Sequence, residues 1–303
     1  MPPRLGALIA IVLWGISFVA TKAALREISP ITLVFLRFAL GTGLLLAMLV
    51  RRGEPLVPPR DAWGPLAWMG FVGIFVHQLL QSYGLSMTSA VHTGWLIGLI
   101  PIWSALLAAI VLGERFGAAK LAGLVLGFAG AVVVVTRGRL GAGLLALPST
   151  RGDLLILAST LNWAIYGVLG HRTLRRLGPG RATAGAMFPG WLMLAPLFVA
   201  GRGWGELARL PPTGWGAVLF LGIGCSGLGY LFWYGALEKI EASRVAAFIY
   251  LEPLVTLAAA VALLGEPVTG ASILGGLLVL LGVLLVQTAP ARPAIGRSPV
   301  TDS

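Results

Sequence analysis

Three side chains that can carry a charge lie inside long apolar runs of this 303-residue chain, namely Arg37, His77 and Glu252. An ionisable group in hydrocarbon is costly, so it faces protein or a water-filled cavity and marks a path for a ligand, an ion or a proton. Glu252 directly precedes Pro253, which frees a backbone carbonyl and permits a kink. We expect the Glu252 carboxylate to bind a proton or a cationic group. An ion pair with Arg37 or a hydrogen bond to a tyrosine is the alternative.

His77 belongs to a polar stripe, because Gln81 follows one helical turn later and Gln78 is its neighbour. A histidine titrates near neutral pH, so we expect His77 to contact a ligand or exchange a proton, with simple packing as the alternative. For Arg37 we expect an interhelical structural pair, with attraction of a carboxylate as the alternative.

Aromatic and small polar residues form a second candidate surface. Trp14 and Ser17 share one helix face, and Trp163 and Tyr166 repeat that spacing in the second half of the chain. Indole and phenol faces with a few polar groups can line a mostly apolar pocket, although packing or an interfacial belt would use the same residues. The candidate substrate-binding residues are Trp14, Ser17, His77, Gln81, Trp95, Asn162, Trp163, Tyr166, Tyr230 and Tyr250, with Glu252 and Arg37 as coupling or charge residues.

The chain lacks the residues that several other kinds of functional site require. The lone Cys225 excludes an intramolecular disulfide and a cysteine-based metal site. The chain contains no P-loop, HExxH or GxSxG motif. The segment 222–227 matches GxGxxG, but no strand precedes it, so it indicates close helix packing or a flexible cavity helix. We therefore expect no catalytic residues, no metal and no cofactor.

The elements that must position these residues are membrane helices. The chain is 57% hydrophobic and only 11% charged, with a mean hydropathy of +0.91, whereas soluble domains are about a quarter charged. Long apolar runs without alternation indicate helices rather than a membrane barrel. Ten such runs lie at about 5–25, 31–50, 64–85, 90–112, 118–136, 153–171, 182–200, 214–237, 244–265 and 268–288.

The basic residues set the expected orientation. Lys and Arg are concentrated in the segments on the same side as the N-terminus, which predicts that both termini are cytoplasmic. The net charge of +11 then reflects loops that face anionic lipid, and we expect no nucleic-acid partner. Lys22 and His92 lie near span ends, where they can reach the interface.

The chain contains two copies of one unit. Residues 99–135 and 251–286 share a proline-bearing helix, an LGE turn and a glycine-rich helix, which pairs Pro101 with Pro253 and Glu114 with Glu266. We expect both glutamates to be helix-end anchors. Five helices per copy would make the repeats inverted, with a substrate site at their interface. The predicted divisions are a first repeat at 1–136, a linker loop at 137–152, a second repeat at 153–288 and a disordered tail at 289–303.

These motifs resemble a known family. The LGE turn that is present twice, WGISF at 14–18, FLRF at 35–38 and YGLxxTSA at 83–90 resemble the EamA-type transporters of the drug/metabolite transporter superfamily. The resemblance implies a ten-helix carrier in a bacterial inner membrane that exports amino acids or other small metabolites. It also implies a central cavity lined by the first, third, fourth, sixth, eighth and ninth spans, with the fifth and tenth at the periphery.

Together these observations predict an all-α integral membrane protein of ten helices in two inverted five-helix repeats. We expect a secondary active transporter that moves small, amino-acid-like solutes outward by alternating access, with proton coupling. The alternatives are a lipid or lipid-linked sugar flippase of the same fold and a membrane-embedded enzyme. The expected partners are a small solute and the bilayer; the identity of the solute and the oligomeric state stay open.

Overall fold

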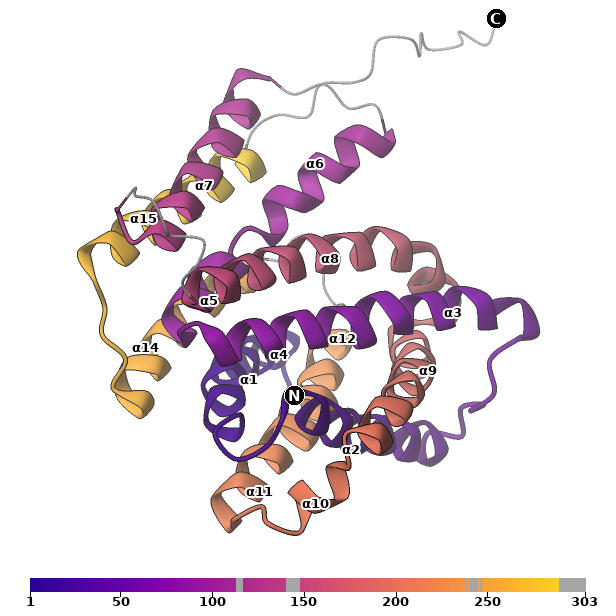
Figure 1. Ribbon diagram of the computed structural model, residues 1–303. Helices are drawn as coiled ribbons and strands as arrows, with labels where there is room; N and C mark the ends of the chain where they lie inside the picture. The colour runs from indigo at the N-terminus through magenta and orange to yellow at the C-terminus, as the bar shows by residue number, and fades with distance from the viewer. Residues whose placement is uncertain (113–116, 140–147, 238, 240–244, 246, 289–303) are drawn as a thin grey trace, which may run out of the picture.

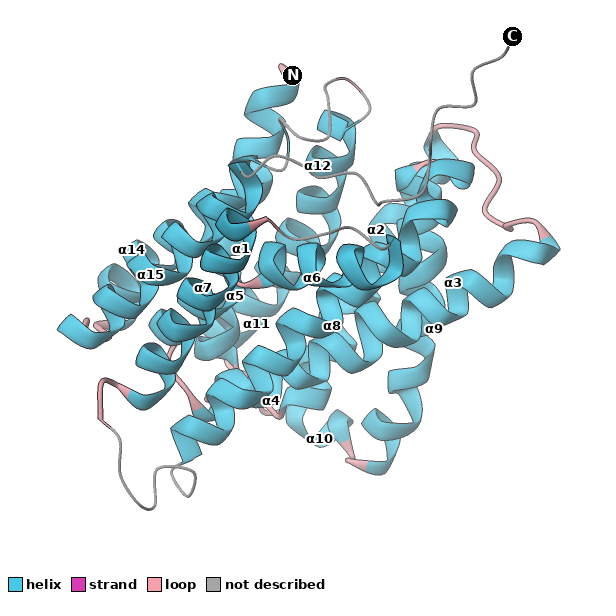
Figure 2. Ribbon diagram, turned by 90° about the horizontal axis from the view of Figure 1, so that it is seen from above, coloured by secondary structure: helices cyan, strands magenta, loops and turns pink. Residues whose placement is uncertain are grey.

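The protein is helical throughout the part that the computed structural model describes, which comprises residues 1–112, 117–139, 148–237, 239, 245 and 247–288. No strand occurs within those residues (Figure 2). Eight helical stretches of the described chain, some of them made of several of the elements named below, are long and apolar enough to cross a membrane. These properties are those of an integral membrane protein. Glu114, the greater part of the linker loop and the tail from residue 289 lie outside the described residues.

The first half of the chain is laid out in Figure 1. Its elements are α1 (Pro3–Ala24), α2 (Pro30–Arg51), the 3₁₀ turn η1 (Arg60–Ala62), α3 (Trp63–Gly70), the π-helical segment η2 (Phe71–Val76), α4 (His77–Met87), α5 (Ala90–Ile97), α6 (Ile100–Leu112) and α7 (Ala118–Thr136). Proline begins α2 after Ser29, whose hydroxyl accepts a hydrogen bond from the Thr32 backbone N–H, as expected at a helix N-terminus.

The second half repeats this pattern of long and interrupted helices. Its elements are α8 (Pro148–Leu177), α9 (Pro179–Ala200), α10 (Gly203–Leu207), α11 (Pro212–Leu219), the π-helical segment η4 (Phe220–Gly229), α12 (Tyr230–Leu237), the 3₁₀ segment η5 (Ala247–Leu251), α14 (Glu252–Leu264) and α15 (Gly270–Thr288). The 30 residues of α8 exceed the ~20 needed to cross a bilayer. The stretch Phe248–Leu264 is a shorter apolar helix.

Four of the expected spans are interrupted rather than continuous. Two of them contain the π-helical segments η2 and η4. No proline marks either segment, and only η4 carries a glycine-rich signal, at 222–227. The other two are interrupted beside a proline, because Pro101 and Pro253 lie in the first turns of α6 and α14 and supply no backbone N–H. Interruptions of this kind are tolerated within a membrane where neighbouring side chains satisfy the freed backbone groups.

Side chains from neighbouring helices support both π-helical segments. The Asn162 side-chain nitrogen on α8 donates to the Val72 carbonyl oxygen of η2 at 2.6 Å. The Trp14 indole nitrogen on α1 donates to the Cys225 carbonyl oxygen of η4 at 3.1 Å. A Cβ placed on Gly222 of η4 would lie 2.6 Å from the Leu40 Cβ of α2. The structure therefore confirms the interpretation of the 222–227 glycines as a close-packing segment.

The helices α7 and α15 lie side by side at one edge of the bundle in both views (Figures 1 and 2). Their backbones approach closely at glycines: a Cβ on Gly130 would lie 2.5 Å from the Gly275 carbonyl oxygen, and one on Gly123 would lie 2.6 Å from that of Gly282. Small residues at such an interface let membrane helices pack by direct backbone contact. Among the described residues, this pair takes no part in the cavity described below.

The LGE turn of the second half serves a structural purpose. Gly265 ends α14 in the left-handed conformation, with φ of +65°, which costs a residue without Cβ little. The Glu266 carboxylate then accepts hydrogen bonds from the backbone N–H groups of Ala90 at 3.0 Å and Val91 at 2.9 Å. These groups belong to the N-terminus of α5, where a negative charge is favourable. Glu266 is thus a helix-end anchor, in agreement with the prediction from its position.

Candidate functional site

A cavity lies where helices from both halves of the chain meet. Its enclosed free volume is about 90 Å³, which is smaller than the roughly 300–1,000 Å³ of typical small-molecule sites, so the cavity is narrow in this structure. Most of the candidate residues contribute to its wall. The candidates that line it are Trp14, Ser17, Arg37, His77, Gln81, Trp163, Tyr230 and Glu252.

Interrupted helices supply much of this wall. His77 and Gln81 are in α4, directly after η2, and Tyr230 begins α12 directly after η4. Glu252 begins α14 at the end of η5. Four apolar residues complete the wall and carry no distinguishing sequence signal, because an apolar side chain in an apolar run looks like any other: Phe18, Ile97, Ile100 and Ile249. Gln78, the neighbour of His77 in the polar stripe, also lines the cavity.

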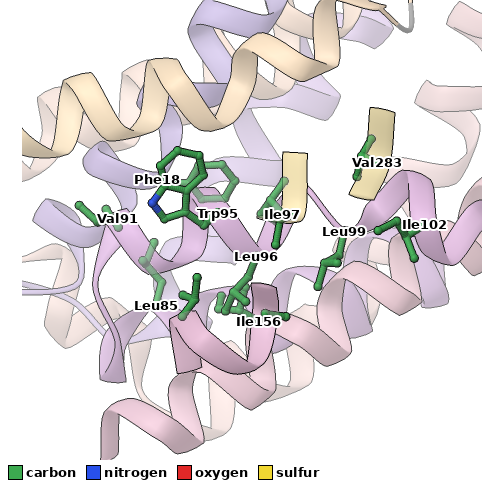
Figure 3. Packing of buried hydrophobic residues seen from close by; sticks show 14 of the residues in the cluster. Phe18, Leu85, Val91, Trp95, Leu96, Ile97, Leu99, Ile102, Ile156 and Val283 are labelled. Carbon is green, nitrogen blue, oxygen red and sulfur yellow. The ribbon is translucent and has the colours of Figure 1, made fainter. Parts of the chain in front are cut away.

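Four candidate residues do not line the cavity. Trp95 is 3% exposed and belongs to an apolar cluster with Phe18 and Leu96 (Figure 3), where Gly276 leaves room for its indole ring. Tyr250 packs at the edge of the same cluster. Both residues were expected in the cavity wall, but in the structure their rings pack in the core.

Asn162 and Tyr166 lie behind the wall instead of in it. The Asn162 side-chain nitrogen is occupied by its hydrogen bond to the Val72 carbonyl oxygen. Tyr166 is 6% exposed and stacks on Trp163, with ring centroids 5.0 Å apart. Its ring also fills the space left by Gly73 of η2, where an added Cβ would lie 2.4 Å from the ring. Both residues therefore support the wall.

Aromatic rings form the apolar part of the wall. Trp14 meets Tyr230 edge to face, with ring centroids 5.3 Å apart, and His77 lies 4.8 Å from Trp163. The His77 Nδ1 atom is 3.0 Å from the Ser159 carbonyl oxygen. A carbonyl oxygen only accepts, so Nδ1 carries the hydrogen, and Nε2 of the neutral ring is an acceptor. One face of the pocket thus combines an apolar surface with a polar group of fixed tautomer.

Arg37 and Glu252 are the two formal charges of the cavity wall. Arg37 is 6% exposed, and its Nε donates to the Ser226 hydroxyl of η4 at 2.8 Å. Neither Arg37 nor Glu252 forms an ion pair with any residue that the structure describes. The structural pair expected for Arg37 is therefore a hydrogen bond to a hydroxyl instead of a salt bridge to Glu252. Two ionisable groups, one basic and one acidic, thus line one cavity without an ion pair to any described residue.

A separate polar network ties helix ends together at one end of the bundle. The Lys22 ammonium of α1 donates to the backbone carbonyl oxygens of Leu85, at 2.8 Å, and of Thr88. The Thr88 hydroxyl donates to the Asp153 carboxylate of α8, whose second oxygen lies 3.1 Å from His92 Nδ1 of α5. Asp153 is fully buried.

This network joins α1, α4, α5 and α8 at one end of the bundle. Sequence reasoning placed Lys22 and His92 near span ends but did not single out Asp153. The sequence did contain a signal for Asp153, because this acid begins an apolar run. An acid that becomes buried needs polar partners. No three His, Cys, Asp or Glu side chains among the described residues are arranged to hold a metal ion.

Comparison with known proteins places this fold in a family. The sequence profile of the EamA-like transporter family matches residues 2–136 and again residues 150–288. The chain belongs to the EamA-like transporter family. It is therefore a multi-pass membrane protein of a transporter family rather than of a family of enzymes.

Curated relatives of this EamA-like transporter carry transporter names. An uncharacterized transporter of Archaeoglobus fulgidus is 33% identical over 92% of this chain and 96% of its own length. A probable terminal-alkyne amino-acid exporter of Streptantibioticus cattleyicolor is 28% identical over 95% of this chain and 93% of its own length. A probable amino-acid metabolite efflux pump of Escherichia coli is 25% identical over 92% of both chains.

Proposed function

We propose that this EamA-like transporter is a secondary carrier that exports small, amino-acid-like solutes across a bacterial inner membrane. The observation that carries the proposal is the cavity, which takes wall residues from both halves of the chain and combines aromatic rings with a cation and an acid. This combination of side chains suits a small solute with a polar end and an apolar end. The names of two bacterial relatives, an exporter and an efflux pump of amino-acid compounds, support the direction and the solute class.

The proposed architecture is ten membrane helices in two inverted five-helix repeats, with both termini cytoplasmic. The profile match to 2–136 and 150–288 supports a division into 1–136 and 153–288 around a linker at 137–152. The interruptions also support this division. The segments η2 and η4 lie in the third and eighth expected spans, and the breaks before α6 and α14 lie in the fourth and ninth. The helix α8 and the stretch Phe248–Leu264 would add two spans to the eight long apolar helices.

Binding is the first property to test. A thermal-shift screen of the purified protein against neutral amino acids, nucleosides and sugar phosphates should show stabilisation by neutral amino acids. A ligand at about one hundred times its Kd stabilises a protein by about 2.7 kcal/mol, which raises the unfolding temperature by a few degrees. Stabilisation by sugar phosphates alone would contradict the proposed solute class.

Alternating access requires a closure on each side of the cavity, and the network of Lys22, Thr88, His92 and Asp153 is the proposed outer closure. Ser17 lines the cavity, and Lys22 lies about 7 Å further along α1 at 1.5 Å per residue. The network thus fastens α1, α4, α5 and α8 only one to two turns beyond the cavity.

Asp153→Asn is expected to loosen this closure. The amide cannot accept as strongly from both Thr88 and His92, and a loss of about 1.4 kcal/mol shifts an equilibrium about tenfold. A Ser17→Cys reporter in a Cys225→Ser background should then react about tenfold faster with an impermeant maleimide added from outside. Asp61→Asn is the matched control, because it breaks the exposed Asp61–Arg176 pair at the other end of α8. Equal labelling of the Asp153→Asn and control proteins would refute the closure.

A further inference from the structure

We infer that the cavity recognises its solute as a zwitterion, with the carboxylate of the solute on Arg37 and its ammonium group on Glu252. The inference rests on the proposed function, and it adds which charges a solute must carry and which residue receives each. It requires two groups of opposite charge that share one cavity and that form no ion pair with a described residue.

Arg37 provides the cationic half of this arrangement. It is 6% exposed, lines the cavity and uses its Nε to donate to the Ser226 hydroxyl. The structure shows no hydrogen bond from the terminal guanidinium nitrogens to a residue that it describes. Those nitrogens form a planar fork that matches the two oxygens of a carboxylate. The bond to Ser226 holds the side chain in place while the fork stays available to a ligand.

Glu252 provides the anionic half. Its side chain is partly buried and lines the same cavity, and the carboxylate makes no hydrogen bond or ion pair with a described residue. Gln78 adds a second acceptor, because its side chain is 4% exposed and its Oε1 atom has no hydrogen-bond partner among the described residues. An ammonium group brings three donors and no acceptor, so it suits this pair.

The balance of charge makes the site selective. A charge away from water is costly unless it is paired, and neither Arg37 nor Glu252 has an ion-pair partner among the described residues. A zwitterion compensates both, whereas an amine leaves Arg37 unpaired and a carboxylic acid leaves Glu252 unpaired. The remaining wall, which includes Trp14, Tyr230 and Ile249, would hold an apolar side chain of the solute.

The test is equilibrium binding, measured by calorimetry on the purified full-length protein. Three probes share one aromatic end: L-phenylalanine, 2-phenylethylamine without the carboxylate, and 3-phenylpropanoate without the ammonium group. The wild type should bind phenylalanine at least about tenfold more tightly than either analogue, since each loses one charge-assisted interaction. Arg37→Gln should reverse the preference toward the amine, and Glu252→Gln should reverse it toward the acid.

The reversal separates recognition from a structural role, because a merely damaged protein would lose all three probes together. Arg52→Gln and Glu54→Gln are the matched controls, since these residues form a 4.0 Å pair whose side chains are 53% and 35% exposed, and both variants should keep the wild-type order. Three results would overturn the inference. An analogue could bind the wild type as tightly as phenylalanine, none of the three probes could bind, or the Arg37 and Glu252 variants could keep the wild-type order. If other solutes showed counterflow in the same preparation, the proposed carrier function would stand even though the inference of zwitterion recognition had failed.

Discussion

Replacing Glu252 by glutamine is expected to abolish the response of transport to a pH gradient. The carboxylate lies in the cavity wall without a partner among the described residues, so it can hold a proton or a cationic group, but not both. A carrier that returns with a proton after releasing the solute is an antiporter driven by the proton gradient. Glutamine keeps the size and the hydrogen-bonding capacity of the side chain but cannot ionise.

Proteoliposomes with an acidic interior provide the measurement. Protons that leave the vesicle should drive solute into it, so the wild type should take up solute faster with the gradient than without it. For Glu252→Gln the two rates should be equal, whatever their absolute size. Glu54→Gln, an acid-to-amide change at a side chain that is only 35% exposed in a loop, should respond as the wild type does. A gradient response that survives in Glu252→Gln would remove this carboxylate from the coupling step.

Filling the cavity from Ser17 should block transport without unfolding the protein. Ser17 is on α1, it lines the cavity, and its hydroxyl donates to the Trp14 carbonyl oxygen at 2.6 Å. An indole ring at this position would occupy the space that the solute needs. We expect Ser17→Trp to lower the rate of solute exchange by about a hundredfold or more, because a loss of about 2.7 kcal/mol of binding already gives that factor.

A matched control exists for this substitution. Ser86 is exposed, and its hydroxyl donates to the Tyr83 carbonyl oxygen three residues earlier at 2.7 Å, as Ser17 does with Trp14. Ser86→Trp should therefore exchange solute at the wild-type rate. Exchange rates in proteoliposomes and the unfolding temperatures of both variants should be measured together. Wild-type exchange by folded Ser17→Trp would mean that solute does not pass through this cavity.

Sequence patterns could predict which residues lie in the cavity when those residues are out of place in hydrocarbon. Arg37, His77 and Glu252 were found because a polar group in an apolar run must face protein or water, and each lines the cavity. The aliphatic wall residue Ile249 could not be found in this way, because its side chain is equally suited to lipid, core and cavity.

Neither the packing of Trp95 nor the π-helical segment Phe71–Val76 could be predicted. An aromatic residue within a span can line a cavity or pack in the core, so Trp95 was expected in the cavity although it packs against Gly276. The π-helical segment Phe71–Val76 depends on the side chain of Asn162, which is distant in sequence and donates to the Val72 carbonyl oxygen. Such a contact forms only when α8 is already packed against it, so no local pattern records it.

At the helix ends, too, the local sequence predicts part of the structure and tertiary packing decides the rest. The glycine of the second LGE turn predicted the end of a helix, and Gly265 does end α14 with positive φ. The choice of Ala90 and Val91 as the partners of Glu266 depends on the approach of α5 to that turn. Asp153 likewise gains its partners Thr88 and His92 only through tertiary packing.

Counterflow in sealed proteoliposomes shows directly whether one alternately accessible cavity carries the solute. Vesicles loaded with an unlabelled neutral amino acid at high concentration would be diluted into a trace of the same labelled amino acid. A carrier with one alternately accessible cavity predicts a transient accumulation of label that saturates with concentration and that Ser17→Trp abolishes. Label that enters no faster than into protein-free vesicles, across a broad panel of small metabolites, would contradict the account.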